Sequence, residues 1–271
     1  MRYGITGSKG FLGRSLYFKL TKKINKSNTL HRFDTRNTNI PNNLDVIFHL
    51  GYSSVKSYQT NHKLSLKCDI ESAEKIVNYC QKNYTQLIFI SSAAIYNNKN
   101  KDNHYAQSKI KIENLFLEYF YSKFFPLTIV RLFNPYGPGQ SLEFVVPQII
   151  NSLIHKHHLI IHQPKSIRDF IYIDDFSELI SHCPIKENEP YIFNLKTGYE
   201  ITIEDLVKLI SSKIGIDYKS YIDFGRDSVD YNFSIDKKIL NVPTSYNFKY
   251  TLNDGLNKTI EFYKSTSKRN F

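Results

Sequence analysis

Residues 2–23 read RYGITGSKGFLGRSLYFKLTKK, a short apolar strand followed by a glycine-rich turn and an apolar helix at 11–23. Gly7, Gly10 and Gly13 have the spacing G-x-x-G-x-x-G. At such a turn the first glycine lets the chain reverse, the second lets a pyrophosphate approach the backbone, and the third lets the helix pack on the strand. The N-terminus of the helix then favours the negative charge of a phosphate. This stretch predicts a strand–loop–helix unit that binds a dinucleotide.

Strands and helices continue to alternate through the first half of the chain. We expect further strands at 29–33, 44–51, 86–96 and 126–133, and helices at 67–82 and 104–123. This alternation predicts an α/β fold with a doubly wound parallel sheet, covered by helices on both faces. Ligands bind such a sheet at the carboxyl ends of its strands. After about residue 134 the alternation becomes irregular, which predicts a smaller, interleaved second lobe.

The composition narrows the class of partner and the compartment. The chain has 41% hydrophobic residues and a formal net charge of +11, yet it has no apolar run long enough to cross a bilayer, so we expect no membrane association. Its lysines are dispersed, which predicts no nucleic-acid partner and suits a small anionic substrate. The first strand leaves no room for a signal peptide, and three scattered cysteines (Cys68, Cys80 and Cys183) predict reduced thiols in a cytoplasm. The HKHH cluster at 155–158 lacks neighbouring carboxylates or cysteines, so we expect no metal site.

Three Tyr-x-x-x-Lys pairs occur, and their context separates them. They begin at Tyr52, Tyr105 and Tyr119, and a chain with 20 tyrosines and many lysines produces this spacing by chance. Tyr105 follows a strand that ends in two serines, and Lys109 lies one turn later on the same face of the helix. Tyr52 has no serine-bearing strand before it, and Tyr119 lies in the aromatic stretch FLEYFYSKFF, which is typical of a core or a subunit contact. We therefore select Tyr105 and Lys109 as the candidate pair.

Taken together, the motifs resemble the extended short-chain dehydrogenase/reductase family, in particular its nucleotide-sugar epimerases, dehydratases and reductases. The segments TGSKGFLG, DVIFHLG, FISSAAIY, YAQSKIKIENL, VRLFNPYGPGQ, RDFIYIDDFSELI, FNLKTGYEITIEDLVKLI and TLNDGLNKTIEFY occur in the family's order along nearly the whole chain. The resemblance implies an NAD(P)-binding Rossmann domain at 1–133, with returning segments near 168–182. It also implies that 134–271 form most of a substrate-binding lobe.

The resemblance further implies roles for individual residues. Tyr105 is the general acid/base, Lys109 lowers its pKa and holds the nicotinamide ribose, and Ser92 hydrogen-bonds the same sugar oxygen. Its neighbour Ser91 is excluded from this role. The positions that match substrate diphosphate contacts are Asn134, Arg168 and Arg226. The cofactor-binding positions, besides Tyr105 and Lys109, are Gly7, Lys9, Gly10, Phe11, Leu12, Gly13, Asp34, Arg36 and Leu50.

Two sets of charges indicate different cofactors. Asp34 lies where an acid would bind the adenine ribose hydroxyls of NAD. Lys9, together with Arg32 or Arg36, would instead hold the 2′-phosphate of NADP. We expect NADP or NAD, with a slight preference for NADP.

The residues after Ser92 restrict the chemistry. The family's 4,6-dehydratases have an Asp-Glu pair at the places of Ala93 and Ala94, and alanine can move no proton. The connection from Ser92 to Tyr105 is shorter than the family's usual one. This short connection, the compact chain and the basic loop favour an NADPH-dependent 4-ketoreductase acting on a nucleotide-linked deoxysugar over a 4-epimerase with tightly bound NAD.

The sequence also bears on functions other than catalysis, on the substrate and on the oligomeric state. A catalytically silent NAD(P)-binding regulator is disfavoured by the joint presence of Ser92, Tyr105 and Lys109, and nothing local in the sequence supports an RNA-binding relative. We expect a nucleotide-diphosphate sugar as the substrate. The resemblance also implies a homodimer formed through the helices at 67–82 and 104–123, and the aromatic residues at the end of the second helix exceed what one core face requires. The residues concerned are Tyr119, Phe120, Phe124 and Phe125.

Overall fold

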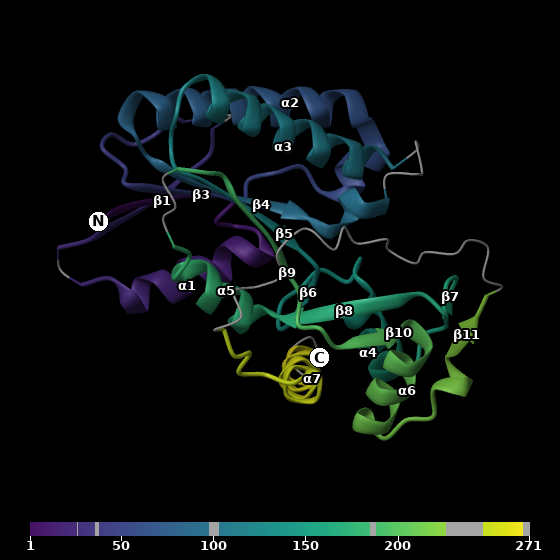
Figure 1. Ribbon diagram of the computed structural model, residues 1–271. Coiled ribbons are helices and arrows are strands. Elements are labelled where there is room, and N and C mark those ends of the chain that lie inside the picture. The colour runs from purple at the N-terminus through teal and green to yellow at the C-terminus, as the bar shows by residue number, and fades with distance from the viewer. Residues whose placement is uncertain (26, 36–37, 98–102, 185–187, 226–245, 268–271) are drawn as a thin grey trace. The chain divides into compact units, whose positions relative to one another are not determined.

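The computed structural model describes the chain except for residues 26, 36–37, 98–102, 185–187, 226–245 and 268–271 (Figure 1). The described residues divide into two compact units. The first contains 1–133 and 177–195, and the second contains 134–176, 196–225 and 246–267. Within these ranges, no helix has both the length and the apolar character needed to cross a membrane. Arg226 and Arg36 lie outside the described residues.

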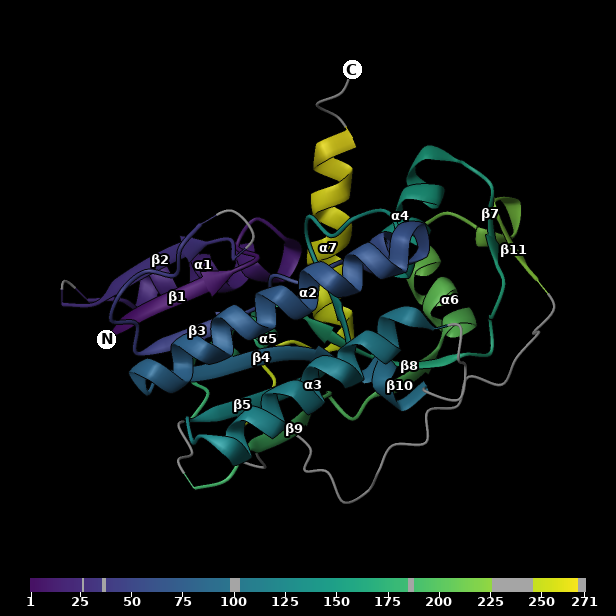
Figure 2. The ribbon, with the colours of Figure 1, turned by 90° about the horizontal axis from the view of Figure 1, so that it is seen from above.

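A six-stranded parallel sheet forms the centre of the first unit (Figures 1 and 2). Its strands are β1 (Arg2–Thr6), β2 (Thr29–Phe33), β3 (Val46–His49), β4 (Gln86–Ser92), β5 (Leu127–Leu132) and β9 (Tyr191–Leu195). They lie in the order β2-β1-β3-β4-β5-β9, with every neighbouring pair parallel. The predicted doubly wound, Rossmann-like sheet is confirmed. Because the strand order reverses at β1, the switch point where such sheets bind ligands lies between β1 and β3.

Helices cover both faces of this sheet (Figure 1). On one face α2 (Val55–Asn83) and α3 (His104–Ser122) lie side by side (Figure 2). On the other face lie α1 (Phe11–Lys23) and, from residue 177 on, α5 (Ile173–Ser181). Strand side chains are buried on both faces, as expected for a parallel sheet between two helical layers. Fully buried examples are Ile5, Ile47, Phe89, Ile129 and Phe193.

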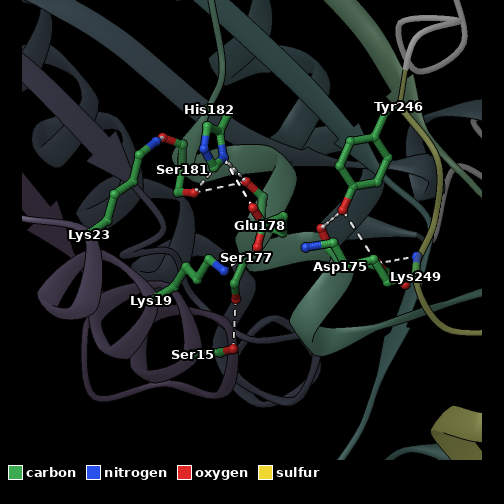
Figure 3. A network of polar contacts seen from close by, with 10 residues as sticks. All are labelled: Ser15, Lys19, Lys23, Asp175, Ser177, Glu178, Ser181, His182, Tyr246 and Lys249. Atoms are coloured by element: carbon green, nitrogen blue, oxygen red, sulfur yellow. Dashed lines mark hydrogen bonds and ion pairs between the residues drawn. The ribbon is translucent and has the colours of Figure 1, made fainter.

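Polar contacts join the returning segment to the first helix (Figure 3). Lys19 donates a hydrogen bond to the carboxylate of Glu178, and the hydroxyls of Ser15 and Ser177 lie 2.6 Å apart. Residues 177–195 follow a long stretch of the second unit in the sequence. These contacts fasten the second half of α5 to α1 of the first unit. They thereby bring the returning segment, which ends in β9, to the edge of the sheet next to β5.

Two boundaries differ by more than two residues from the sequence-based expectation. The helix expected at 67–82 begins twelve residues earlier, at Val55, and is interrupted at Asn61, where φ is −153° and ψ is 86°. Ser54 begins it as a side-chain cap that accepts from the backbone N–H of Ser57 at 3.1 Å. The early part, VKSYQTNHKLSL, lacks a regular apolar stripe and so gave no helical signal. In addition, the strand expected to reach residue 96 ends at Ser92, and Ala93–Asn97 form a 3₁₀ helix.

The second unit is built on shorter strands. Its elements are β6 (Asn134–Tyr136), α4 (Val145–His155), β7 (Leu159–Ile161), β8 (Ile167–Tyr172), the start of α5, β10 (Glu200–Thr202), α6 (Ile203–Ile214), β11 (Ile222–Phe224) and α7 (Leu252–Ser267). The strands form a three-stranded sheet in the order β10-β8-β6 and a separate β11-β7 pair. The buried carboxylate of Asp175 accepts hydrogen bonds from the backbone N–H of Lys249 and from the hydroxyl of Tyr246 (Figure 3). It also accepts from the backbone N–H of Tyr250. These contacts hold the segment before α7 against α5.

The aromatic residues near the end of α3 are divided between core and surface. Phe120 and Phe125 are buried in the core of the first unit, whereas Phe124 is 39% and Tyr121 is 75% exposed. Tyr119 is partly buried against the same core, so three of the four aromatic residues that suggested a surplus pack wholly or partly inside the unit. The exposed apolar surface is carried by Phe124 and by Tyr121, which the sequence argument did not single out.

Candidate active site

The glycine loop joins the carboxyl end of β1 to α1. Gly7 has φ of 66°, in the left-handed region that favours glycine, and a Cβ there would lie 2.6 Å from the backbone of Leu50 and Gly51. A Cβ on Gly13 would lie 2.1 Å from the carbonyl oxygen of Gly7, so α1 packs directly on the loop. By contrast, a Cβ on Gly10 would approach only that same oxygen, at 3.3 Å. The exposed backbone at Gly10 is thus a cradle that a side chain would fill, which fits the pyrophosphate of a dinucleotide.

A threonine at the end of β1 fixes the opposite wall of this loop. Thr6 is the register partner of His49, and its hydroxyl accepts from the backbone N–H groups of Leu50 at 3.1 Å and Gly51 at 2.8 Å. The same oxygen lies 2.8 Å from Nδ1 of His49. Since this hydroxyl already accepts twice, its own proton goes to Nδ1 and the ring carries its proton on Nε2. Burial, followed by the charge of Lys109, lowers the pKa of His49 to about 3, so the ring is neutral.

The remaining cofactor candidates lie at the same edge of the sheet. Phe11 and Leu12 are half-buried at the start of α1, and Lys9 is exposed within the loop. Thr6 pairs in register with Phe33, so Asp34 follows β2 at the level of the glycine loop. Asp34 is half-buried, and its backbone N–H donates to the hydroxyl of Thr38 at 3.1 Å.

Arg32 has a different environment from the one proposed for a phosphate ligand. Its guanidinium lies over the ring of Tyr17, 4.6 Å from the ring centre. An arginine on an aromatic face is held by cation–π attraction. Three basic residues were suggested for the 2′-phosphate of NADP. Arg32 packs on Tyr17, Arg36 lies outside the described residues, and Lys9 lies in the glycine loop itself.

Ser92 and Tyr105 are brought together across the end of β4. Tyr105 lies on the first turn of α3, whose start is capped by Asn103: its side chain accepts from the backbone N–H of Ala106 at 3.1 Å. The side chains of Ser92 and Tyr105 are hydrogen-bonded to each other. Burial raises the pKa of Tyr105 to about 12, while the hydrogen bond with Ser92 lowers it and the charge of Asp69 raises it. The phenol is consequently protonated at neutral pH.

The two serines at the end of β4 point to different partners. The hydroxyl of Ser91 donates to the carboxylate of Glu113 at 2.5 Å, and that carboxylate also pairs with Arg131 at 2.7 Å. Ser92, on the opposite face of the strand, reaches Tyr105. This arrangement separates the two neighbours as the sequence reading did, because successive strand residues alternate between faces.

Lys109 lies one turn beyond Tyr105 and is almost completely buried. Its ammonium donates to the carbonyl oxygen of Ile90 at 2.9 Å and lies 5.9 Å from the ring centre of Tyr105. It also lies 3.6 Å from the ring centre of Tyr52. Burial lowers the pKa of this lysine to about 7, against the opposing charges of two carboxylates, Asp69 and Glu113. A group with this pKa titrates in the neutral range, which is frequent at functional sites.

A buried carboxylate accompanies the pair. Asp69 of α2 accepts from the backbone N–H of Ser53 at 3.1 Å, from the hydroxyl of Ser53 at 2.9 Å and from the hydroxyl of Tyr58 at 2.8 Å. Burial raises the pKa of Asp69, and these hydrogen bonds and the charge of Lys109 lower it in turn. The hydroxyls of Tyr52 and Tyr58 are 3.4 Å apart. Two tyrosines and an acid that the sequence analysis did not select therefore border the predicted catalytic residues.

The proposed diphosphate contacts lie on the second unit. Asn134 begins β6, and its amide donates to the carbonyl oxygen of Asp169 at 2.9 Å. Arg168 lies on the neighbouring strand β8 and donates to the carbonyl oxygen of Ile167 at 2.8 Å. The structure brings these two residues to adjacent strands of one sheet. Arg226 falls outside the described residues.

Two signals in the sequence could have identified the residues that were missed. Asp69 shares a helix face with the buried residues Ser72, Ala73, Ile76 and Cys80, and a carboxylate on an apolar stripe is unusual. Tyr52 follows directly after β3, at the sheet edge where ligands bind. That Tyr52 adjoins Lys109 rather than its own sequence partner Lys56, however, depends on the packing of α3 beside β3 and β4. Local spacing carries no such information.

Comparison with known proteins places this site in a family. Residues 4–195 match the NAD dependent epimerase/dehydratase family. The chain is similar to a dTDP-D-glucose 4,6-dehydratase of Dictyostelium discoideum, with 27% identity over 76% of this chain and 60% of that protein. It is also similar to a GDP-6-deoxy-D-talose 4-dehydrogenase of Aggregatibacter actinomycetemcomitans, with 25% identity over 78% of this chain and 79% of that protein.

The fold is shared with solved structures at low sequence identity. A UDP-glucose 4-epimerase of Thermotoga maritima, solved with UDP-glucose, superimposes with a TM-score of 0.79 at 20% identity, covering 98% of this chain and 100% of that one. The chain spans between 49% and 60% of the length of the 4,6-dehydratases that it matches. The family match, in contrast, covers the glycine loop, Ser92, Tyr105 and Lys109, and all of the parallel sheet except the first two residues of β1. This chain belongs to the NAD dependent epimerase/dehydratase family.

Proposed function

We propose that this protein is a reductase that uses NADPH, or NADH, to reduce the 4-keto group of a nucleotide-linked deoxysugar. The observation that carries the proposal is the protonated phenol of Tyr105, hydrogen-bonded to Ser92 and one helical turn from Lys109. Reduction of a ketone needs a proton donor at the oxygen, and a phenol with its pKa held at about 12 is in the donor state at neutral pH. The relative named as a 4-dehydrogenase of GDP-6-deoxy-D-talose supports redox chemistry at this carbon.

The dinucleotide is proposed to bind at the glycine loop. Gly7, Gly10 and Gly13 supply the cradle, and Leu50 forms its opposite wall. Bound there, the nicotinamide supplies the hydride. Asp34 would accept from adenine ribose hydroxyls in the NAD form, and Lys9 would neutralise the 2′-phosphate in the NADP form, to which we give a slight preference.

Three side chains perform the proton chemistry in this proposal. Tyr105 donates its phenolic proton to the sugar oxygen O4, and Ser92 donates a second hydrogen bond to the same oxygen. Lys109, as an ammonium, stabilises the phenolate that Tyr105 becomes and binds ribose hydroxyls. Asn134 and Arg168 of the second unit are proposed to contact the substrate's diphosphate, because amide and guanidinium donors suit its oxygens.

A dehydratase activity is not part of the proposal. Eliminating water across C5 and C6 requires one group to remove a proton and another to protonate the departing hydroxyl. The residues that follow Ser92 are Ala93 and Ala94, in the 3₁₀ helix, and neither can exchange a proton. The similarity to 4,6-dehydratases is therefore attributed to the common family.

The test measures NADPH and NADH oxidation with a panel of nucleotide-linked 4-keto-6-deoxysugars. We expect cofactor oxidation only when such a sugar is present, and a loss of about 10²- to 10⁴-fold in Tyr105→Phe with sugar binding retained. Tyr119→Phe is the matched control, since Tyr119 also precedes a lysine by four residues but lies at the other end of α3. Protein that is isolated with bound NAD and interconverts two sugars without net redox change would establish a 4-epimerase instead.

A further inference from the structure

Tyr52 occupies an unexpected place beside the proposed catalytic lysine. It follows β3, and its ring lies beneath the ammonium of Lys109, 3.6 Å from the nitrogen to the ring centre. This is the shortest of the three aromatic contacts of Lys109, since the corresponding distances are 4.8 Å for Phe89 and 5.9 Å for Tyr105. A cation so close to a ring face is attracted by the negative potential of the ring, and more strongly when water is excluded.

A backbone carbonyl group restricts the position of the ammonium as well. Lys109 donates to the carbonyl oxygen of Ile90, which belongs to the rigid strand β4. The carbonyl holds the nitrogen from one direction, and the ring of Tyr52 limits it from another. A flexible four-carbon side chain is thereby confined to one position, and confinement of this kind is what a ribose-binding ammonium requires.

The ring of Tyr52 is itself held by a second layer. It stacks on Tyr58, with ring centres 6.1 Å apart and an angle of 23° between the planes, and it meets Tyr105 edge to face at 6.2 Å. Tyr58 is fully buried and donates to the carboxylate of Asp69 at 2.8 Å. Asp69 in turn accepts from both the backbone and the side chain of Ser53, the residue next to Tyr52. The loop after β3 is therefore tied to α2 on both sides of the ring.

We propose that Tyr52 is a positioning residue that acts through its ring face. The ring holds the ammonium of Lys109 in the position from which Lys109 stabilises the phenolate of Tyr105 and binds the ribose. This inference deepens the proposed reductase function and depends on it for the kinetic part of the test. The hydroxyl of Tyr52 has its own partners, Ser108 and, at 3.4 Å, Tyr58, whereas Lys109 lies over the ring face. Phenylalanine at position 52 should therefore preserve the position of Lys109, whereas an aliphatic residue should not.

The charge of Lys109 responds to several neighbours, and the test must separate them from the ring. Asp69 faces it from α2, Glu113 from α3 and His49 from β3. Both carboxylates raise the pKa of Lys109, and burial lowers it. Substitution of Tyr52 leaves all three neighbours in the chain, so a change in the titration of Lys109 reports on the ring and on the burial that the ring provides.

The first experiment requires no activity. Protein labelled with ¹³C at the lysine ε carbon is examined by ¹H–¹³C correlation NMR without cofactor, and the Lys109 resonance is assigned by its absence in Lys109→Arg. Protons above a ring face are shielded, so we expect an upfield Lys109 signal in the wild type and in Tyr52→Phe. In Tyr52→Leu the signal should join the other lysines, and the pKa of Lys109 should fall by about half a unit to one and a half units.

The second experiment measures the reductase. In Tyr52→Leu we expect kcat to fall by about 2- to 30-fold with an unchanged KM for the sugar, whereas Tyr52→Phe stays near the wild type. Melting temperatures show that each variant is folded. An upfield Lys109 signal that persists in folded Tyr52→Leu, or an equal loss of activity in Tyr52→Phe, would overturn the proposal. If the NMR result holds but no sugar is reduced, the positioning of Lys109 stands and the proposed function fails.

Discussion

Burial has the largest effect on the pKa values of Tyr105 and Lys109, and one carboxylate shifts both values in the same direction. Asp69 raises the pKa of Tyr105 and the pKa of Lys109, because its negative charge disfavours a phenolate and favours an ammonium. For a reductase both effects are useful: the phenol stays a proton donor, and the ammonium stays charged. Burial raises the pKa of Asp69 itself, and hydrogen bonds from Tyr58 and Ser53 and the charge of Lys109 lower it in turn.

Asp69→Asn should therefore shift the pH dependence toward acid. Asparagine keeps an acceptor oxygen for Tyr58 but removes the charge, so the pKa of Lys109 should fall below its value of about 7. Reduction requires the ammonium, which exists below this pKa, so the fall of kcat/KM on the alkaline side should begin at lower pH in the variant. The pH profile of kcat/KM reports these groups in the free enzyme. Glu118→Gln, an exposed change of the same charge on α3, is the control, and an unshifted profile in Asp69→Asn would contradict the assignment.

Within the glycine loop, different glycines are expected to matter for folding and for cofactor binding. A Cβ on Gly13 would lie 2.1 Å from a backbone oxygen, so α1 would have to move away from β1. A side chain on Gly10 would meet the loop only at 3.3 Å and would otherwise occupy the space proposed for the pyrophosphate. The same type of substitution should thus have different consequences three residues apart.

We expect Gly13→Ala to destabilise the fold by about 1–3 kcal/mol, the usual cost of overpacking. Gly10→Val should remain folded, with a melting temperature near that of the wild type, and should lose dinucleotide binding. Thermal unfolding and calorimetric titration with NADPH and NADH measure the two effects separately. Unchanged cofactor affinity in folded Gly10→Val would show that the dinucleotide does not bind at this loop.

The elements also show what local sequence can predict. Glycine spacing and alternating apolar strands suffice for the parallel sheet, because β1, β4 and β5 are short runs buried on both faces. The first part of α2 was missed because it lacks a regular apolar stripe and because contacts such as the hydrogen bond from Tyr58 to Asp69 cross the interruption at Asn61. Likewise, the Tyr105–Lys109 spacing is readable on one helix, whereas the ring of Tyr52 beneath Lys109 results from packing between separate elements. The family and the parallel sheet were therefore easier to predict than the packing around the candidate catalytic pair.

For the whole chain, the division of its segments between the two units was predicted less completely than the individual helices and strands. The irregular pattern after about residue 134 indicated a second lobe, and the structure divides the described chain at residue 133. The return of 177–195 to the first unit depends on contacts such as Lys19 with Glu178, which join residues far apart in sequence (Figure 3). No periodicity within α5 reveals that its two halves belong to different units.

The surface of the first unit bears on assembly. Near the ends of α2 and α3, Tyr84 is 52% exposed, Tyr121 75% and Phe124 39%, and the rings of Tyr84 and Phe124 lie 5.9 Å apart. Exposed aromatic side chains gathered in one place are typical of protein interfaces. Phe18, which is 61% exposed on α1, lies on the opposite helical layer and offers a comparison.

We expect the protein to form a homodimer through α2 and α3, with a mass of twice 31.8 kDa by light scattering at micromolar concentration. Tyr121→Asp should raise the dimer dissociation constant by about tenfold or more, the cost of removing a central aromatic contact. Because Tyr121 is largely exposed within one chain, this substitution should leave the melting temperature of the dissociated protein unchanged. Phe18→Asp introduces the same charge on the other layer and should not alter the dissociation constant. A monomeric mass for the wild type, or equal effects of the two substitutions, would place the contact elsewhere or rule out the dimer.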